Sequence, residues 1–206
     1  MRLAFGVEYD GTEWNGWQTQ ICKNTVQDAI ELALSKFASQ RIKIICAGRT
    51  DSGVHAKGQV IHFDTEINRQ IWNWIRGTNS LLPKSIRIKW GSIVSADFHA
   101  RFSAKSRTYS YTICNSPIES PLSSRSSTWI YQRLNEKKMQ LASECLIGKH
   151  DFSSFRSSEC QANSPVRIIN RCDLERDGVF LKIQIEANGF LHHMVRNIMG
   201  CLYEVG

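Results

Sequence analysis

The spacing of apolar residues constrains the fold of this chain more than any other feature of its sequence. Every second residue from Leu3 to Tyr9 is apolar, which is typical of a half-buried strand. In residues 25–37, apolar groups recur at the helical spacing, and Thr25 with Asp28 resembles a capping box. A chain that uses both periods within its first 40 residues is predicted to pack helices against a sheet.

The same two periods return along the rest of the chain. Asn135 is expected to cap a helix at 136–147 and Gly148 to end it. Asp177-Gly178 is expected to join the strands 166–174 and 179–186 as a hairpin. Further strands are predicted at 42–46, 59–64, 86–94, 166–174 and 179–186, and further helices at 67–76, 136–147 and 190–203.

This order predicts an α+β fold built from two similar subdomains. The first is expected to span residues 1–97 and the second residues 98–206, with one continuous sheet shared between them. The chain has 206 residues, of which 42% are hydrophobic, so it is long and apolar enough to bury a core.

Lys and Arg exceed Asp and Glu by 26 to 19, which gives a formal net charge of +7. Such a balance fits a protein that binds a polyanion, because basic side chains that contact phosphates release counterions. It also fits a protein whose charge serves only solubility, and charge alone leaves both interpretations open.

The cysteines follow no metal-binding or redox spacing, since no two lie within four residues of each other. The odd count and the absence of a leader-like N-terminus predict a reduced, cytoplasmic protein with buried thiols. No apolar run is long enough to span a bilayer, so no membrane partner is expected. The cysteines are at positions 22, 46, 114, 145, 160, 172 and 201.

One loop carries an unusual set of charged residues. AGRTDSGVH, residues 47–55, separates two predicted strands and contains Arg49, Asp51 and His55. In an extended loop Arg49 and Asp51 would point to the same side, as an ion pair or around a shared ligand. The alternative is that Asp51 only forms a turn with Ser52 and the following glycine.

Rival chemistries fit this loop less well. Asp-Ser-Gly also occurs in aspartic proteases, but a neighbouring arginine would keep Asp51 ionised, against a shared-proton mechanism. Ser52 lacks the glycine pattern of a nucleophile elbow. No glycine-rich nucleotide-binding motif is present, and His192 and His193 are adjacent without metal-ligand spacing, so neither a cofactor nor a metal is predicted.

A basic and aromatic segment follows at residues 98–111. Its arginines and lysine could track phosphates while a ring stacks on an unpaired base. Equally, its aromatic residues could face the core of a strand with solvated basic residues outside. In the last predicted helix, His192, Arg196 and Tyr203 lie along one flank of the apolar stripe, where a cation either reaches solvent or pairs with a carboxylate.

Five blocks of the sequence stand out together: EYDGTEWNGWQ at 8–18, AGRTDSGVHAKGQVIHF at 47–63, DFHARFSAKSRTYSY at 97–111, DFSSFR at 151–156 and GFLHHMVRNIMG at 189–200. With these blocks in this order, the chain closely resembles the bacterial tRNA pseudouridine synthase A family, and the resemblance extends from residue 2 to residue 206.

The resemblance implies roles for individual residues. Asp51 matches the family's catalytic aspartate, Tyr109 the tyrosine that stacks on the target base, and Arg196 the arginine that pairs with the catalytic carboxylate. Arg49 resembles the basic residue that helps hold the extruded nucleotide. The further residues expected to bind substrate are His55, Arg101, Lys105 and Arg107.

The resemblance also implies a fold, a substrate and an assembly. The expected fold has a mixed, mostly antiparallel central sheet, helices on one face and an active-site cleft on the other. The expected activity converts uridines 38, 39 and 40 of the tRNA anticodon arm to pseudouridine, without a cofactor, in a homodimer. Members of the family usually continue past the residues that match Glu204–Gly206, so the second subdomain is expected to be incomplete. An impaired tRNA-binding relic and an RNA chaperone are the alternatives.

Overall fold

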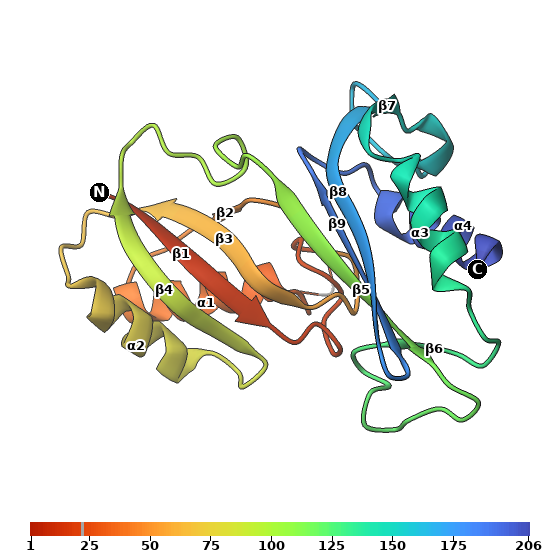
Figure 1. The fold of residues 1–206 in the computed structure, drawn as a ribbon. Coiled ribbons are helices and arrows are strands. Elements are labelled where there is room, and N and C mark those ends of the chain that lie inside the picture. Colours follow the sequence, from red (N-terminus) through yellow and green to blue (C-terminus); the bar gives the residue numbers. More distant parts are fainter. Residues whose placement is uncertain (22) are drawn as a thin grey trace. The chain divides into compact units, whose positions relative to one another are not determined.

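The computed structural model describes residues 1–21 and 23–206, so the buried thiol expected at Cys22 lies outside the described residues. The chain divides into two compact units, residues 1–104 and 105–206 (Figure 1). The boundary therefore lies seven residues beyond the predicted one at residue 97. Residues 98–104 belong to the first unit because Arg2 and His62 bind their backbone, through Arg2 Nη1 to Phe98 O (2.9 Å) and Ala100 N–H to His62 Nδ1 (3.1 Å).

The first unit is a four-stranded sheet with two helices. Its strand order is β2-β3-β1-β4, and β1 pairs antiparallel with both neighbours. The elements are β1 (Arg2–Tyr9), α1 (Val26–Ala38), β2 (Ile45–Cys46), β3 (Ala56–Asp64), α2 (Ile71–Leu81) and β4 (Ile86–Val94).

Both helices of the first unit contribute to one core. Phe5 of β1 lies edge-on to Phe63 of β3, with ring centroids 5.2 Å apart. Trp74 of α2 contacts Phe37 of α1 and also Phe63 of β3, so α1 and α2 cover the same face of the sheet. Thr25 caps α1, because its Oγ1 accepts the Asp28 N–H as the sequence predicts.

The second unit is a five-stranded mixed sheet with two longer helices and a short 3₁₀ helix. Its strand order is β6-β5-β9-β8-β7, in which only the β5–β6 pair is parallel. The elements are β5 (Arg107–Asn115), β6 (Thr128–Ile130), α3 (Glu136–Glu144), β7 (Gly148–Asp151), η1 (Ser153–Phe155), β8 (Val166–Asp177), β9 (Phe180–Ala187) and α4 (Met194–Val205).

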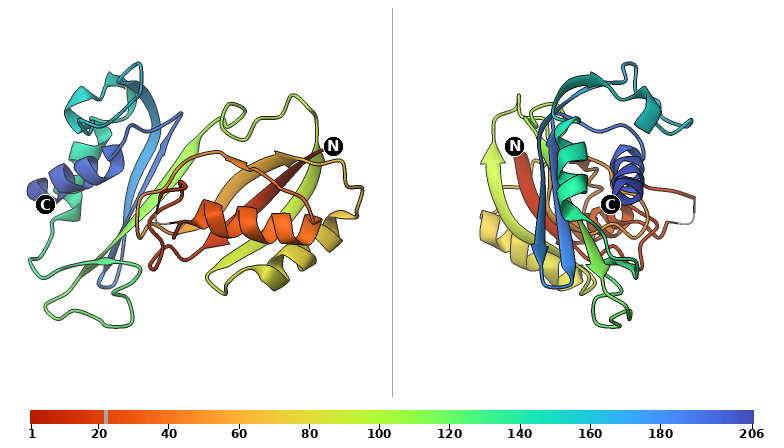
Figure 2. Two further views of the ribbon diagram at one scale, coloured as in Figure 1. Left: turned by 180° about the vertical axis from the view of Figure 1, so that it is seen from behind. Right: turned by 45° about the vertical axis from the view of Figure 1, so that its right-hand side comes forward.

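Helices α3 and α4 lie on the same side of this second sheet (Figure 2). Every second residue of β9, from Leu181 to Ala187, is fully buried, and the apolar stripe of α4 is buried with them. The Asp177-Gly178 hairpin forms as predicted, with Gly178 at φ +58, a conformation that favours glycine. The α+β class with mixed, mostly antiparallel pairing is thus confirmed.

The expected single shared sheet is wrong. The described strands pair into two separate sheets, one in each unit. The reason lies in the pairing of β5, because its residues 107–114 pair with β9 and its residues 113–115 pair with β6, both strands of its own unit.

Several predicted element boundaries are also wrong, each for a local reason. The strand expected at 42–46 is only Ile45–Cys46, because the Ile42 N–H bonds Ser35 Oγ and the Ile44 N–H bonds Glu31 Oε1. Helix α4 begins at Met194, since His193 has φ +60, which a right-handed helix cannot contain. His192 therefore precedes the helix and does not share its flank.

Other differences concern weaker patterns. Helix α2 spans 71–81 where 67–76 was expected, and it ends just before Pro83. Helix α3 ends at Glu144, four residues before Gly148, because the chain tightens there through Leu146 N–H to Ser143 O. The short strands β6 and β7 carry too few residues for their period to be recognised.

The six described cysteines are all free thiols, of which Cys145 and Cys201 are exposed, contrary to the expectation of buried thiols throughout. Among the described residues, no helix has the length and apolarity that a transmembrane segment requires.

Candidate functional site

The Asp51 loop, residues 47–55, connects β2 to β3 in the first unit. The Val54 N–H donates to Asp51 O (3.2 Å), which closes a β-turn over residues 51–54. Gly53 has φ +77 and supplies the left-handed conformation that this turn requires. The turn interpretation of Asp-Ser-Gly is therefore confirmed for the backbone, and it places the Asp51 side chain at the start of a defined turn.

Two glycines of the first sequence block lie directly against this loop. A Cβ on Gly11 would lie 2.1 Å from Val54 O, and a Cβ on Gly16 would lie 2.9 Å from Thr50 O. No side chain fits at either position without displacing loop backbone. The blocks EYDGTEWNGWQ and AGRTDSGVH thus form one structure, in which the first supports the second.

Hydrogen bonds fix the two sides of the turn to the same support. The Trp17 N–H donates to Thr50 O (3.0 Å), and Tyr9 Oη lies 2.8 Å from Thr50 Oγ1. Beyond Asp51, the Gly53 N–H donates to Trp14 O (3.3 Å). Tyr9 and Trp17 are buried in the core of the unit, so these bonds tie the turn to a rigid base.

The start of the loop is held by Gln59 of β3. Its Nε2 donates to Gly48 O (2.5 Å) and its Oε1 accepts the Gly48 N–H (3.4 Å). The Ala47 N–H donates to Val60 O (2.8 Å), which continues the β2–β3 ladder by one residue. The buried Gln59 side chain thus takes the place of a strand partner where the pairing ends.

His55 closes the other end of the loop. Its Nδ1 lies 3.1 Å from the Gly11 nitrogen and 3.0 Å from an Asp10 carboxylate oxygen. These two contacts place the imidazole against the Asp10-Gly11 turn of the first sequence block. The predicted substrate-binding residue His55 therefore also braces the loop against the Asp10-Gly11 turn.

Two predicted substrate-binding arginines, Arg49 and Arg101, both lie near the Cys46 thiol of the first unit. Burial raises the pKa of the Cys46 thiol to about 11, and the charges of Arg49 and Arg101 both act against this rise. Cys46 immediately precedes the Asp51 loop, so Arg101 lies near that loop despite a separation of 50 residues from Asp51 in the sequence. Both arginine side chains are exposed.

The basic and aromatic segment 98–111 is divided between the two units. Its first part, with Arg101, folds on the first unit, and its last part enters β5 of the second. Tyr109 on β5 lies edge-on to Phe190 at 5.0 Å, and its partly buried ring packs against the core of the second unit. Arg107 on the same strand donates to Asn188 O (2.9 Å), and Lys105 precedes the strand.

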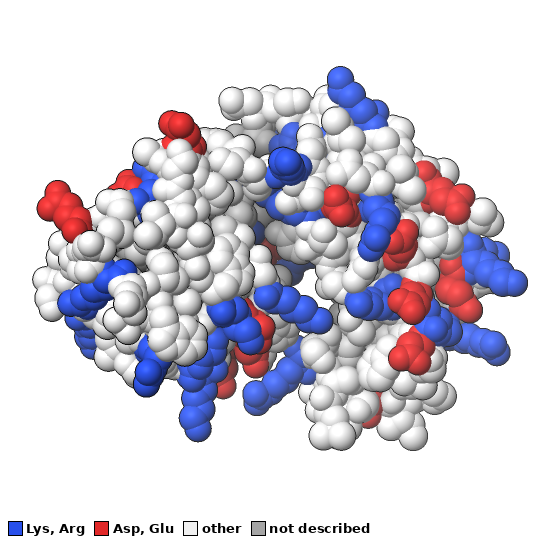
Figure 3. All heavy atoms as spheres, turned by 60° about the vertical axis from the view of Figure 1, so that its left-hand side comes forward, with Lys and Arg blue, Asp and Glu red and all other residues white. Residues whose placement is uncertain are grey.

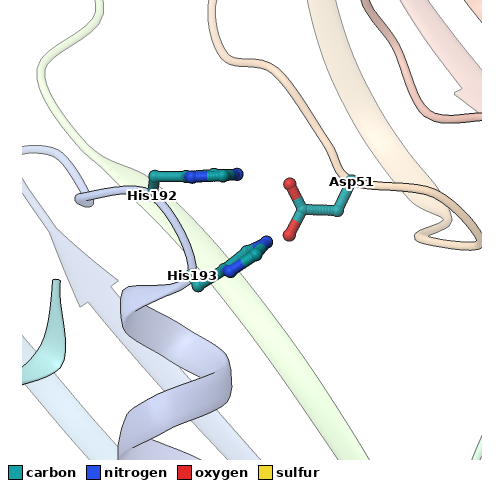
Figure 4. A group of neighbouring side chains, drawn as sticks. All are labelled: Asp51, His192 and His193. Carbon is teal, nitrogen blue, oxygen red and sulfur yellow. The ribbon is translucent and has the colours of Figure 1, made fainter. Parts of the chain in front are cut away.

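Arg196 lies in the first turn of α4 and is exposed. Figure 4 shows His192 and His193 at the N-terminal end of that helix, and Asp51 on its loop in the first unit. The His192 N–H donates to Cys160 Sγ (3.4 Å), which ties the start of α4 to the segment after η1. Taken alone, neither unit gathers three potential metal ligands of the His, Cys, Asp and Glu types among the residues that the structure describes.

The sequence analysis missed the residues that support the loop. Gly11, Gly16 and Gln59 carry no reactive group, so their chemistry gives no functional signal. The available signal was the pair of glycines spaced by five residues in a segment that otherwise reads as a turn. Glycines that permit close backbone approach are a recurrent sign of a supported loop.

Comparison with known proteins identifies the family. The model of the tRNA pseudouridine synthase family matches residues 6–103 and 142–206. Proteins named tRNA pseudouridine synthase A from Albidiferax ferrireducens, Herminiimonas arsenicoxydans and Legionella pneumophila are 51%, 52% and 52% identical to this chain. Each alignment covers the whole chain, and 79%, 76% and 79% of the respective relative.

The chain belongs to the tRNA pseudouridine synthase family. Asp51 and Arg196 lie within the residues that the family model matches, whereas Tyr109, Arg107 and Lys105 lie between its two matched segments. Those three residues are included in the full-length alignments with the relatives. The resemblance stated from the five sequence blocks is thereby confirmed.

Proposed function

We propose that this chain converts uridine to pseudouridine in tRNA, at positions 38, 39 and 40 of the anticodon arm. Membership of the tRNA pseudouridine synthase family over the full chain is the observation that carries the proposal. The anchored turn at Asp51 adds physical support, because a catalytic carboxylate must be held in place before the substrate arrives.

The proposed reaction is an isomerisation that consumes nothing but uridine. The bond between N1 of uracil and C1′ of ribose breaks, the base turns, and a C5–C1′ bond forms. C5 then loses its proton to solvent, and N1 gains a proton. Atoms and electrons balance without an oxidant or reductant, which suits the reaction without a cofactor that the family resemblance implies. A uridine within a helical stack must first be extruded, at an unstacking cost of a few kcal/mol.

We assign Asp51 the role of nucleophile or base. Tyr109 is proposed to stack on the uracil and hold it through the detached state, because a base that stays beside the sugar rejoins in an effectively unimolecular step. Arg196 is proposed as the cation that favours the ionised carboxylate. These three roles follow the family resemblance of their sequence blocks.

The remaining proposed binding residues are basic or close to Asp51. Arg49 and His55 are on the Asp51 loop itself, and Arg101, Lys105 and Arg107 are proposed to contact phosphates or bases. Lys and Arg side chains are spread over the face in Figure 3, with acidic side chains among them. The net charge of +7 favours association with a polyanion, and the affinity should fall as salt rises.

The experiment measures tritium released from anticodon-arm RNA labelled at C5 of uridine, since bond formation at C5 expels that hydrogen. The wild-type chain should release tritium. Asp51→Asn should lower the rate by about 10²- to 10⁴-fold, which is the usual contribution of a positioned acid or base. Asp173→Asn is the matched control, because Asp173 is an exposed carboxylate paired with Arg171 on β8.

Each outcome has a clear meaning. RNA binding by the wild-type chain without tritium release would replace the proposal with a tRNA-binding relic or an RNA chaperone. Activity that survives Asp51→Asn would remove Asp51 from the mechanism. We further propose a cytoplasmic homodimer, and a sedimentation experiment that finds only monomer at micromolar concentration would contradict that assembly.

A further inference from the structure

Phe102 is an exposed ring in a unit whose other described phenylalanines lie in or against the core or the sheet. Its surface is 75% exposed. One side of the ring is covered by the imidazole of His99, with centroids 4.3 Å apart and planes inclined by 26°, and the Arg101 guanidinium lies 5.6 Å from the ring centroid. We call His99, Arg101 and Phe102 the stacking platform.

The platform is ordered by its own backbone. The Ser103 N–H donates to His99 O (2.7 Å), and the His99 N–H donates to Ser103 Oγ (3.0 Å). The Phe102 N–H donates to His99 Nδ1 (3.3 Å), which sets the imidazole beside the ring. An exposed aromatic side chain held this way loses little further freedom when a flat ligand stacks on it.

A buried histidine anchors the platform to the sheet. His62 of β3 is 2% exposed, its Nδ1 accepts the Ala100 N–H (3.1 Å), and its ring lies 4.9 Å from that of His99. On the other side, Arg2 donates to Phe98 O (2.9 Å) and holds Asp64 with a bidentate pair of 2.8 Å bonds. The platform therefore projects from a rigid base.

The platform also lies close to the Asp51 loop. His62 pairs with Ile45 and Ile61 pairs with Cys46, so the strand that anchors the platform also borders the residue before that loop. The charges of Arg49 and Arg101 both reach the Cys46 thiol. A nucleotide chain that passes Asp51 can thus meet Phe102 within the same unit.

We propose that the platform binds one unpaired nucleotide of the RNA substrate, with the base stacked on the exposed ring of Phe102 and Arg101 on the adjoining phosphate. The inference rests on the proposed function and deepens it, since it assigns a second nucleotide contact besides the target uridine. A flat exposed ring beside a guanidinium is the combination that unpaired bases and phosphates recognise. A protein partner is the competing occupant, which the experiment tests.

The first measurement is the affinity for an anticodon-arm RNA by fluorescence anisotropy at fixed salt. Phe102→Ala should weaken binding by about 5- to 150-fold, the usual effect of losing one base–aromatic stack. Phe102→Tyr should bind like the wild type, whereas Phe102→Leu, which keeps an apolar side chain without a ring, should bind like the alanine variant.

Trp72→Ala is the matched control, because Trp72 on α2 is a 61% exposed aromatic of the same unit outside the platform. It should leave the affinity unchanged. Equal affinities of Phe102→Ala and wild type, or of the leucine and tyrosine variants, would overturn the stacking proposal. Loss of binding in Trp72→Ala as large as in Phe102→Ala would also overturn it.

A second measurement reports stacking directly. RNA in which 2-aminopurine replaces one loop nucleotide at a time should show a position whose fluorescence is quenched by the wild type and by Phe102→Tyr but not by Phe102→Ala. Arg101→Gln should keep the quench and reduce the slope of log affinity against log salt by about 1. If no labelled position distinguishes the wild type from Phe102→Ala, the result contradicts the platform.

These outcomes separate the inference from the proposed function. Phe102-dependent quenching without tritium release would remove the proposed activity and leave the platform as an RNA-binding site. Tritium release with an unchanged Phe102→Ala affinity would remove the platform and leave the activity. The affinity and quenching measurements do not depend on turnover, and tritium release does not report on stacking at Phe102.

Discussion

Replacing Gly11 with alanine should displace the Asp51 loop without removing any functional group. The new Cβ would lie 2.1 Å from Val54 O and 2.6 Å from Val54 C, and both of these are backbone atoms. Contacts under 3.0 Å are not tolerated, so the loop or the Gly11 segment must move by at least 3.0 − 2.1 = 0.9 Å. The backbone of Gly11 does not have the positive φ seen at Gly16 and Gly53, so the perturbation is steric alone.

The size of the effect follows from that displacement. Inserting one methyl group into a well-packed position costs about 1–3 kcal/mol of folding free energy. A shift of about 1 Å in catalytic geometry can lower the rate by about 10²-fold. Gly11→Ala should therefore remain folded, with a modest loss of stability and a rate of pseudouridine formation reduced about a hundredfold.

Gly58→Ala is the matched control for this prediction. Gly58 is also in the first unit, on β3, and nothing lies within 4 Å of its added Cβ. Both variants would be measured by denaturant unfolding and by tritium release from RNA labelled at C5 of uridine. A rate for Gly11→Ala within threefold of that for Gly58→Ala would refute the claim that this glycine sets the position of Asp51.

Further predictions concern His62, Gln59 and Asn135. Burial lowers the pKa of His62 in the folded chain below its ordinary value of 6.5, so in acid the unfolded chain binds a proton more readily than the folded chain. The folded state therefore keeps its full stability above about pH 6.5 and loses stability as the pH falls from there through the folded-state pKa. His62→Asn, whose Oδ1 can still accept the Ala100 N–H but does not titrate, should lose less unfolding free energy between about pH 7 and pH 5. Gln59→Leu removes both side-chain bonds to Gly48 and should cost about 1–3 kcal/mol in unfolding and slow tritium release, whereas unchanged activity would separate Gln59 from the loop. Asn135→Ala removes the cap of α3 and should cost about 1 kcal/mol in unfolding without changing RNA affinity, and a loss of affinity would contradict its purely structural role.

Local patterns determined most of the elements. The alternation from Leu3 to Tyr9 specified β1, because side-chain direction in a strand has a period of two whatever the strand packs against. Thr25 and Asn135 marked helix starts correctly, since capping bonds join residues only three apart in the sequence.

Elements that depend on distant partners were less predictable. Ile42 and Ile44 carry a strand-like pattern, yet side chains of α1 bind their amides and end β2 early. The segment 98–111 reads as one basic and aromatic unit, yet His62 and Arg2 hold its first part on the first sheet while Arg107 begins β5. No local period encodes such a long-range hydrogen bond.

The sequence by itself determined the family, the α+β class and Asp51 as the candidate catalytic residue, because five blocks of reactive and structural residues occur in one order. Only the tertiary structure decided that Gly11 and Gly16 lie against the Asp51 loop and that Phe102 is exposed on an ordered platform. These properties arise from close approach between segments far apart in the chain, and a glycine or a phenylalanine looks the same in sequence whether it supports a site, fills a core or projects into solvent.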